Sequence, residues 1–146
     1  MTTSATGYAP EQDFLIDTGP LVAIINSGDR WHAACLAAIT GRRGRLLTTE
    51  AVITEALYLL EGSRPAIRAC LGMVLDGTLA VQPMSPHRWE RALVLMDKYA
   101  DLPMDYADAT LVVLAEDLGM SDILTLDSRD FGVYRIAGTG AFHILP

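Results

Sequence analysis

The chain has 146 residues, a formal net charge of −7 and 51% hydrophobic residues. This length suits one compact domain, and the hydrophobic content excludes a globally disordered chain. The acidic balance argues against a general nucleic-acid coat protein, which would be basic. No apolar run approaches the roughly 20 residues that span a bilayer, and the N-terminus shows no secretory signal. We therefore expect a cytoplasmic protein without membrane contact, with a flexible tail at 1–12 and a single domain at 13–146.

The predicted elements alternate between short apolar strands and helices with recognisable capping residues. Phe14, Leu15 and Ile16 form an apolar run that stops at an aspartate, which is typical of a buried parallel strand. In chain order we predict a strand at 13–17, helices at 20–26 (capped by Thr18) and 30–41 (capped by Asp29), a strand at 45–48, helices at 49–61 and 63–75, a strand at 78–82, helices at 85–99 and 105–118, and strands at 122–125 and 141–145.

This alternation predicts the architecture of the chain. Strands that alternate with helices form a parallel sheet covered on both faces. We therefore expect an α/β fold, a three-layer α/β/α sandwich around a central parallel sheet of about five strands. The two cysteines, Cys35 and Cys70, are far apart and lie in apolar helical stretches. They are expected to be buried thiols rather than a disulfide or a zinc site.

The acidic residues fall at particular places in this pattern. Asp17 ends the first predicted strand and Asp127 follows the fourth. Ligands of open parallel sheets bind beyond the carboxyl ends of the strands. Asp105 and Asp108 are spaced i and i+3 at the start of a helix and so share one face. Glu55 lies on a helix whose neighbouring positions are largely apolar.

Each of these acids also has a structural interpretation when taken alone. Asp17 and Asp127 are ordinary turn or cap residues, and Asp105 or Asp108 would stabilise a helix N-terminus by about 0.3–1 kcal/mol. Glu55 is compatible with a partly exposed helix position or a buried ion pair. Together, however, these acids would meet at one rim of the sheet, where the predicted elements place no lysine or arginine to pair with them. Crowded carboxylates repel one another, and a hard divalent cation such as Mg²⁺ or Mn²⁺ removes that conflict.

Four segments at these acids resemble the motifs of the PIN-domain family. They are DTGPL at 17–21, TEAVITE at 49–55, DATLVVLA at 108–115 and TLDSRDF at 125–131. The resemblance covers about residues 13 to 146 in the right order and spacing. The short single-domain length is most similar to the VapC-type toxins of bacterial toxin–antitoxin pairs.

This resemblance implies a metal-dependent endoribonuclease of the PIN-like fold, which cleaves RNA with Mg²⁺ or Mn²⁺ as cofactor. It also implies a homodimer and a small antitoxin protein that blocks the site. The implied metal-site and catalytic acids are Asp17, Glu55, Asp108 and Asp127. Further residues are expected to surround them: hydroxyls that hydrogen-bond the ligating carboxylates, and additional acids. These are Thr18, Thr125, Asp105 and Asp130.

Two other functions stay open at this point. The first is a metal-dependent phosphohydrolase of another α/β family; the dehalogenase-like class would require DxD after the first strand, whereas Thr18 and Gly19 follow Asp17. The second is a non-catalytic module whose acidic pocket holds a structural cation or a basic peptide. Trp31 and Trp89 are candidates for base stacking, although helix packing or a dimer face is the favoured interpretation. Phosphate contacts would fall to local arginines: Arg42, Arg43, Arg45, Arg129 or Arg135.

Overall fold

The computed structural model describes residues 12–146. The predicted tail at 1–12 therefore lies outside the described residues except for Gln12. At the centre is a five-stranded sheet in the order β3-β2-β1-β4-β7, in which every neighbouring pair is parallel. Its strands are β1 (Phe14–Ile16), β2 (Leu46–Thr49), β3 (Leu79–Gln82), β4 (Asp122–Leu124) and β7 (His143–Leu145).

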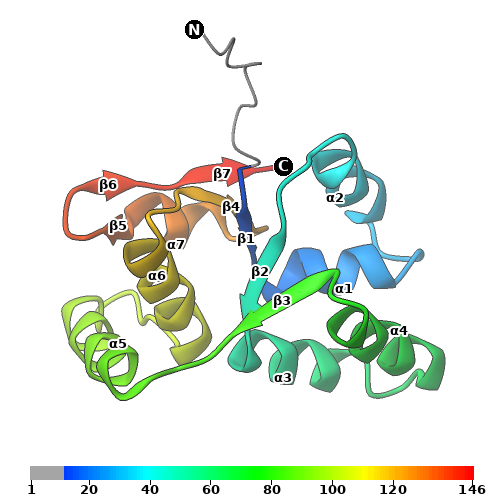
Figure 1. Ribbon diagram of the computed structural model, residues 1–146, viewed down its shortest axis with the longest axis horizontal. Helices are drawn as coiled ribbons and strands as arrows, with labels where there is room; N and C mark the ends of the chain where they lie inside the picture. The colour runs from blue at the N-terminus through cyan, green and yellow to red at the C-terminus, as the bar shows by residue number, and fades with distance from the viewer. Residues whose placement is uncertain (1–11) are drawn as a thin grey trace, which may run out of the picture.

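Helices cover both sides of this sheet. They are α1 (Thr18–Ile25), α2 (His32–Ile39), α3 (Glu50–Leu59), α4 (Arg64–Leu75), α5 (Pro86–Lys98), α6 (Tyr106–Leu118) and α7 (Ser128–Val133). Figure 1 shows α1, α2 and α4 on one side of the strands and α5, α6 and α7 on the other. The predicted α/β/α sandwich with a parallel sheet of about five strands is thus confirmed.

The strands β1, β2 and β4 are buried along their whole length, and α6 is buried along most of its length. All three residues of β1 are buried, because helices cover the sheet on both faces at its central strand. In α6 the run Ala109–Ala115 is buried throughout, since the helix packs on the sheet and is itself covered by α5. Cys35 and Cys70 are buried free thiols, as predicted. Within residues 12–146, no helix is long and apolar enough to cross a membrane.

Two predicted details were wrong and one segment was missed. The cap of α1 is Asp17, whose carboxylate accepts from the Thr18 amide, so the helix begins at Thr18 rather than Pro20. The cap of α2 is Trp31, without a side-chain hydrogen bond; Asp29 instead accepts from the Trp31 amide just outside the helix. Residues 126–140 were not assigned from sequence, yet they contain α7 and most of a small antiparallel hairpin of β5 (Arg135–Ile136) and β6 (Gly140–Ala141). The strand predicted at 141–145 is divided between the last residue of β6 and β7.

Candidate metal centre

The predicted acids gather where the strands end and the helices begin. Asp17 follows the last residue of β1 and caps α1, Asp127 follows β4 and caps α7, and Asp105 caps α6. Three helix N-termini therefore point their free N–H groups toward the same rim of the sheet. Helix N-termini favour negative charge nearby, so this arrangement offsets part of the repulsion between the carboxylates.

Asp17 is held by two short hydrogen bonds. Its Oδ1 accepts from the Thr18 amide at 2.8 Å, and its Oδ2 accepts from the Thr125 hydroxyl at 2.8 Å. The same Thr125 oxygen accepts from the Asp127 amide at 3.0 Å, so one buried hydroxyl links the ends of β1 and β4. Each carboxylate oxygen has two lone pairs, and Asp17 therefore keeps capacity for a further ligand.

Asp108 is fixed from two directions. The Tyr134 hydroxyl donates to its Oδ2 at 2.7 Å, which leaves Oδ1 free. Deeper in the fold, the buried hydroxyls of Thr49 and Thr110 lie 2.8 Å apart and attach α6 to the end of β2. This contact sets where the first turn of α6 stands relative to the sheet. Asp108 accordingly has little freedom to move away from the rim.

Three carboxylates are close enough to bind one ion. Asp108, Asp127 and Asp130 each place an oxygen within 4.8 Å of the others. The Asp130 amide also donates to Asp127 Oδ1 at 3.1 Å, the first-turn bond that caps α7. From sequence, Asp130 was an outer residue and Asp17 a direct ligand. In the structure Asp130 lies near Asp108 and Asp127, and Asp17 is linked to Asp127 through Thr125. The assignment of direct ligands stays a prediction.

Glu55 and Asp105 stand at the exposed edge of this group. Glu55 lies on α3, where its Oε2 accepts from the Thr18 hydroxyl at 3.0 Å. Asp105 is exposed, and its Oδ1 accepts from the Asp108 amide at 2.8 Å. Both carboxylates repel the charge on Asp17 and raise its pKa. All eight residues singled out from sequence therefore lie at the same rim.

The electrostatics of the rim raise the pKa values of the two most buried acids, Asp17 and Asp108. Burial raises the pKa of Asp17 to about 6, against the hydrogen bonds from Thr18 and Thr125. Burial also raises the pKa of Asp108 to about 8; the Tyr134 hydrogen bond opposes this, and the charges of Asp105, Asp17 and Asp127 add to it. Near neutral pH, Asp108 would thus hold a proton that a cation must displace.

Basic side chains do not neutralise these acids. Among residues 12–146, none of the ion pairs joins a lysine or arginine to the predicted metal-site acids. Arg42 and Arg45 pair with Asp122 and Asp13 at the opposite end of the sheet. Arg135 donates to backbone carbonyls of α7 and its cap. Burial and the adjacent Asp127 raise the pKa of Asp130, and the charge of the nearby Arg129 only partly opposes this rise.

The donor set fits a hard divalent cation. It offers carboxylate and hydroxyl oxygens, which Mg²⁺ and Mn²⁺ prefer, and no histidine or cysteine lies among the residues just described. The crowding of unpaired carboxylates and the raised pKa values of Asp17 and Asp108 are what a missing positive charge would produce. Asp108, Asp127 and Asp130 would hold the ion directly, with Asp17 beside them.

Sequence reasoning missed Tyr134. It is fully buried, caps the end of α7 and donates to Asp108 across 26 positions of sequence. Burial and the adjacent carboxylate raise its pKa, so the phenol remains a donor at ordinary pH. The available signal was weak: a tyrosine in the motif-free stretch after DSRDF, where no helix had been predicted.

Comparison with known proteins decides the family. The family model described as "PIN domain" matches residues 14–138. The chain belongs to the PIN-domain family. It is 31% identical over 135 residues to Ribonuclease VapC26 of Mycobacterium tuberculosis, an alignment that covers 90% of this chain and 99% of that protein. It is also 31% identical over 121 residues to a VapC ribonuclease of Archaeoglobus fulgidus, covering 79% of this chain and 77% of that one.

Known structures agree with this PIN-domain assignment at the level of the fold. The crystal structure of Mycobacterium tuberculosis VapC20, described as a toxin that cleaves the sarcin-ricin loop, superposes with a TM-score of 0.76 at 18% identity. It covers 92% of this chain and 100% of that one. A toxin–antitoxin complex from Klebsiella pneumoniae gives a TM-score of 0.65 at 18% identity, covering 83% and 92%.

Proposed function

We propose that this PIN-domain protein is a metal-dependent endoribonuclease, the toxin of a toxin–antitoxin pair. The observation that carries the proposal is the rim of unpaired acids: Asp108, Asp127 and Asp130 lie within 4.8 Å of one another, and Asp17 is bonded to the same network. Its relatives VapC26 and the archaeal VapC are named ribonucleases, and both align over most of the chain. Its substrate would then be met in the cytoplasm.

Each residue of the rim has a definite task in this proposal. Asp17 and Asp108 supply the buried carboxylates, whose proton loss accompanies cation binding. Thr125 and Tyr134 orient those carboxylates through bonds of 2.8 and 2.7 Å. Asp127 and Asp130 add oxygens at the exposed side of the site. Glu55, which is exposed and accepts a hydrogen bond from Thr18, would orient an attacking water.

A bound Mg²⁺ or Mn²⁺ would neutralise the phosphate charge and make water a stronger nucleophile. The acids alone would repel an RNA phosphate, so the net charge of −7 is compatible with a nuclease only in this metal-loaded form. Because no side-chain nucleophile is required, hydrolysis would leave 5′-phosphate and 3′-hydroxyl ends.

Two partners belong to the same proposal. The Klebsiella pneumoniae neighbour is a toxin–antitoxin complex, which supports a small antitoxin for this chain. A homodimer is also proposed, because the helices leave large apolar side chains exposed. Examples are Leu75, which is 87% exposed, and Leu93, which is 63% exposed.

The proposal is tested by incubating the purified protein with total RNA, with Mg²⁺ or Mn²⁺ and with EDTA, and by analysing the product ends. Metal-dependent cleavage with 5′-phosphate ends is expected, and it should be lost in Asp108→Asn. Cyclic 2′,3′-phosphate ends, or cleavage that persists in EDTA, would contradict the proposed chemistry. Hydrolysis of small phosphoesters but not RNA would favour the phosphohydrolase alternative, and a site that binds metal without hydrolysing either would favour the binding module.

A further inference from the structure

A pocket of about 820 Å³ opens beside the acidic rim. Its walls come from α3, from the end of β3 and the turn after it, and from the first turns of α5 and α6. Glu55 belongs both to this pocket and to the hydrogen-bond network of Asp17. On α6, Tyr106 and Ala107 line the pocket directly before Asp108. The pocket therefore adjoins the acidic rim at Glu55 and at the first turn of α6.

Two stacked aromatic rings form one wall of the pocket. The centroids of the Trp89 and Tyr106 rings lie 4.8 Å apart, and the ring planes are within 13° of parallel. Although Tyr106 covers one side of the indole, Trp89 is still 54% exposed. A residue that served only to pack α5 against α6 would be buried. The exposed aromatic surface beside a cleavage site is suited to stacking on an unpaired base.

The polar groups of the pocket select against phosphate and in favour of a neutral ligand with N–H donors. Glu50 and Glu55 line it, together with the Gln82 amide, and no lysine or arginine is among its lining residues. Within residues 12–146, Glu50 takes part in no ion pair. A carboxylate has two acceptor oxygens, which match the adjacent N–H donors on the pairing edge of guanine. The corresponding edge of uracil presents two carbonyl oxygens around one N–H, and these would face the carboxylates.

We propose that this pocket binds one unpaired base of the RNA next to the cleaved phosphodiester, by stacking on Trp89, with guanine preferred over uracil through Glu50. This inference rests on the proposed ribonuclease function and specifies its substrate: single-stranded or looped RNA with a base free to turn out of its helix. Stacking supplies affinity and the carboxylate supplies selectivity. Trp89 is accordingly a substrate-binding residue, Glu50 is the specificity residue, and neither takes part in the chemical step.

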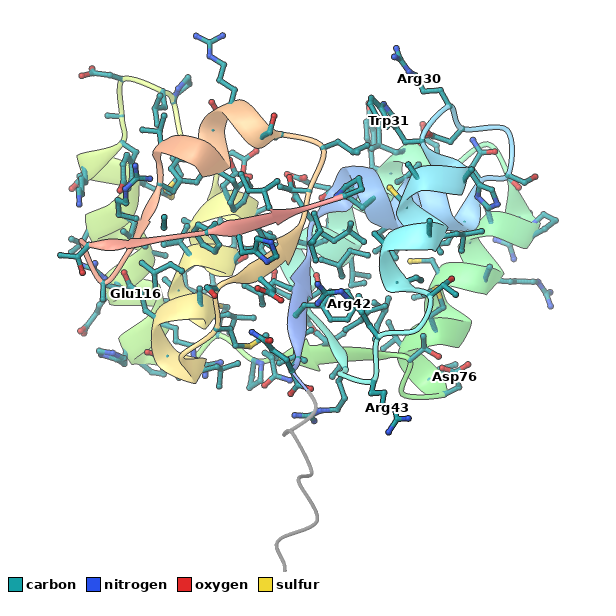
Figure 2. All side chains as sticks on the ribbon, turned by 90° about the horizontal axis from the view of Figure 1, so that it is seen from above. Arg30, Trp31, Arg42, Arg43, Asp76 and Glu116 are labelled. Carbon is teal, nitrogen blue, oxygen red and sulfur yellow. The ribbon has the colours of Figure 1, made fainter. Side chains whose placement is uncertain are left out.

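The other tryptophan is a matched control. Trp31 is 41% exposed and caps α2, on the side of the sheet away from α5, and the Arg30 guanidinium lies 5.1 Å above its ring. Figure 2 shows Arg30 and Trp31 together at the outer end of α2. The chain has two tryptophans, so Trp31→Phe leaves Trp89 as the sole indole fluorophore.

The first experiment measures base binding without catalysis. Guanosine and uridine, which carry no phosphate, are titrated in EDTA into the Trp31→Phe protein while the Trp89 fluorescence is followed. Saturable quenching at lower concentration for guanosine than for uridine is expected, and Glu50→Gln should remove the difference. Absence of saturable quenching by either nucleoside would overturn the base pocket without bearing on RNA cleavage.

The second experiment measures base preference during cleavage. Trp89→Ala, Trp89→Phe and Trp31→Ala are compared with the unaltered chain on a random-sequence RNA pool, with cleavage sites mapped. Trp89→Ala should raise KM about tenfold to hundredfold with kcat less affected, and should weaken the base preference next to the cut. Trp89→Phe should restore most of the affinity, and Trp31→Ala should behave like the unaltered chain.

The outcomes separate this inference from the function on which it rests. If the unaltered chain cleaves RNA and Trp89→Ala changes neither KM nor base preference, the pocket is not a base site although the nuclease stands. If no RNA is cleaved but guanosine still quenches Trp89, the nuclease proposal fails and the base site stands. If Trp89→Ala abolishes self-association in sedimentation and leaves base preference intact, the surface belongs to a second copy of the chain and the inference is wrong.

Discussion

The two ends of the central sheet treat acidic residues in opposite ways. At the amino ends of the strands, the buried Asp122 accepts from Arg42 at 3.1 Å and from His143 at 3.0 Å, and Asp13 accepts from Arg45 at 2.9 Å. At the carboxyl ends, the acids around Asp17 and Asp108 have hydroxyl and amide donors but no basic partner among residues 12–146.

This difference distinguishes acids that stabilise the fold from acids that are available to bind a ligand. A buried carboxylate costs free energy unless a partner compensates it, and Asp122 has that partner inside the chain. The carboxyl-end acids repel one another, and the fold only moderates the repulsion with helix N-termini and hydroxyls. In the proposed function a divalent cation would supply the compensation that the chain itself does not provide.

The largest effect is expected when one acid at each end of the sheet is replaced by asparagine and the two variants are compared. Asp108→Asn should lower RNA cleavage more than a hundredfold, because outer partners of metal ligands alone account for about 10- to 100-fold. Asp122→Asn should leave cleavage within about threefold and lower the free energy of unfolding by about 1–3 kcal/mol. Cleavage rates and urea unfolding of both variants check this. Equal loss of activity in a folded Asp122→Asn protein would remove the distinction between the two ends.

The second prediction concerns the stability of the metal-free protein. The pKa of Asp17 is about 6 and that of Asp108 about 8 in the folded chain, against an ordinary value of 3.8. The folded state therefore binds extra protons between about pH 4 and pH 8, and stability is lost as the pH rises through this window. The raised pKa of Asp17 alone corresponds to a loss of about 3 kcal/mol in the free energy of unfolding as the pH rises, at 1.36 kcal/mol per pKa unit.

The matched measurement is urea unfolding in EDTA, at pH 5 and at pH 8, of the unaltered chain and of Asp17→Asn. The variant should become more stable relative to the unaltered chain as the pH increases, because it has lost the carboxyl that resists ionisation. A difference that is constant with pH, or that changes in the opposite direction, would show that the site acids ionise freely in the folded protein.

A smaller effect is expected from the hydroxyl that orients Asp108. Tyr134→Phe keeps the buried ring and removes the 2.7 Å hydrogen bond. Cleavage should fall about tenfold, and Mn²⁺ affinity should fall in parallel, since the carboxylate loses its fixed orientation. Tyr99→Phe is the control, because the Tyr99 ring packs against Tyr134 but its hydroxyl accepts from the Arg135 amide and bonds none of the acids. Equal behaviour of the two variants would assign Tyr134 to packing alone.

Local patterns were enough to predict the sheet and the six longer helices. Apolar runs such as 14–16 and capping residues such as Ser63 and Ser85 act within a few positions, so they are visible in the sequence. The segment after β4 could not be predicted, because it lacks such local patterns. The helix α7 has six residues and no room for an apolar period, and the hairpin turns at Ala137 and Gly138, where φ is 50° and 81°.

The site was predictable as a set of acids but not as a geometry. The motifs located Asp17, Asp108 and Asp127, because strand ends and helix starts are set by local sequence. Which oxygens approach one another depends on packing between distant elements, such as the contact between Thr49 and Thr110 that positions α6. The closeness of Asp130 and the hydrogen bond from Tyr134 both depend on α7, and so they escaped sequence reasoning.

Calorimetric titration of the metal-free protein with Mn²⁺ at pH 7 tests the central claim most directly. We expect saturable binding accompanied by proton release, because the cation would displace the proton held at Asp108. The release is detected as a dependence of the heat on the ionisation enthalpy of the buffer. Binding should be lost in Asp108→Asn and kept in Asp122→Asn. Absence of binding, or binding that Asp108→Asn leaves unchanged, would contradict a metal site at this rim.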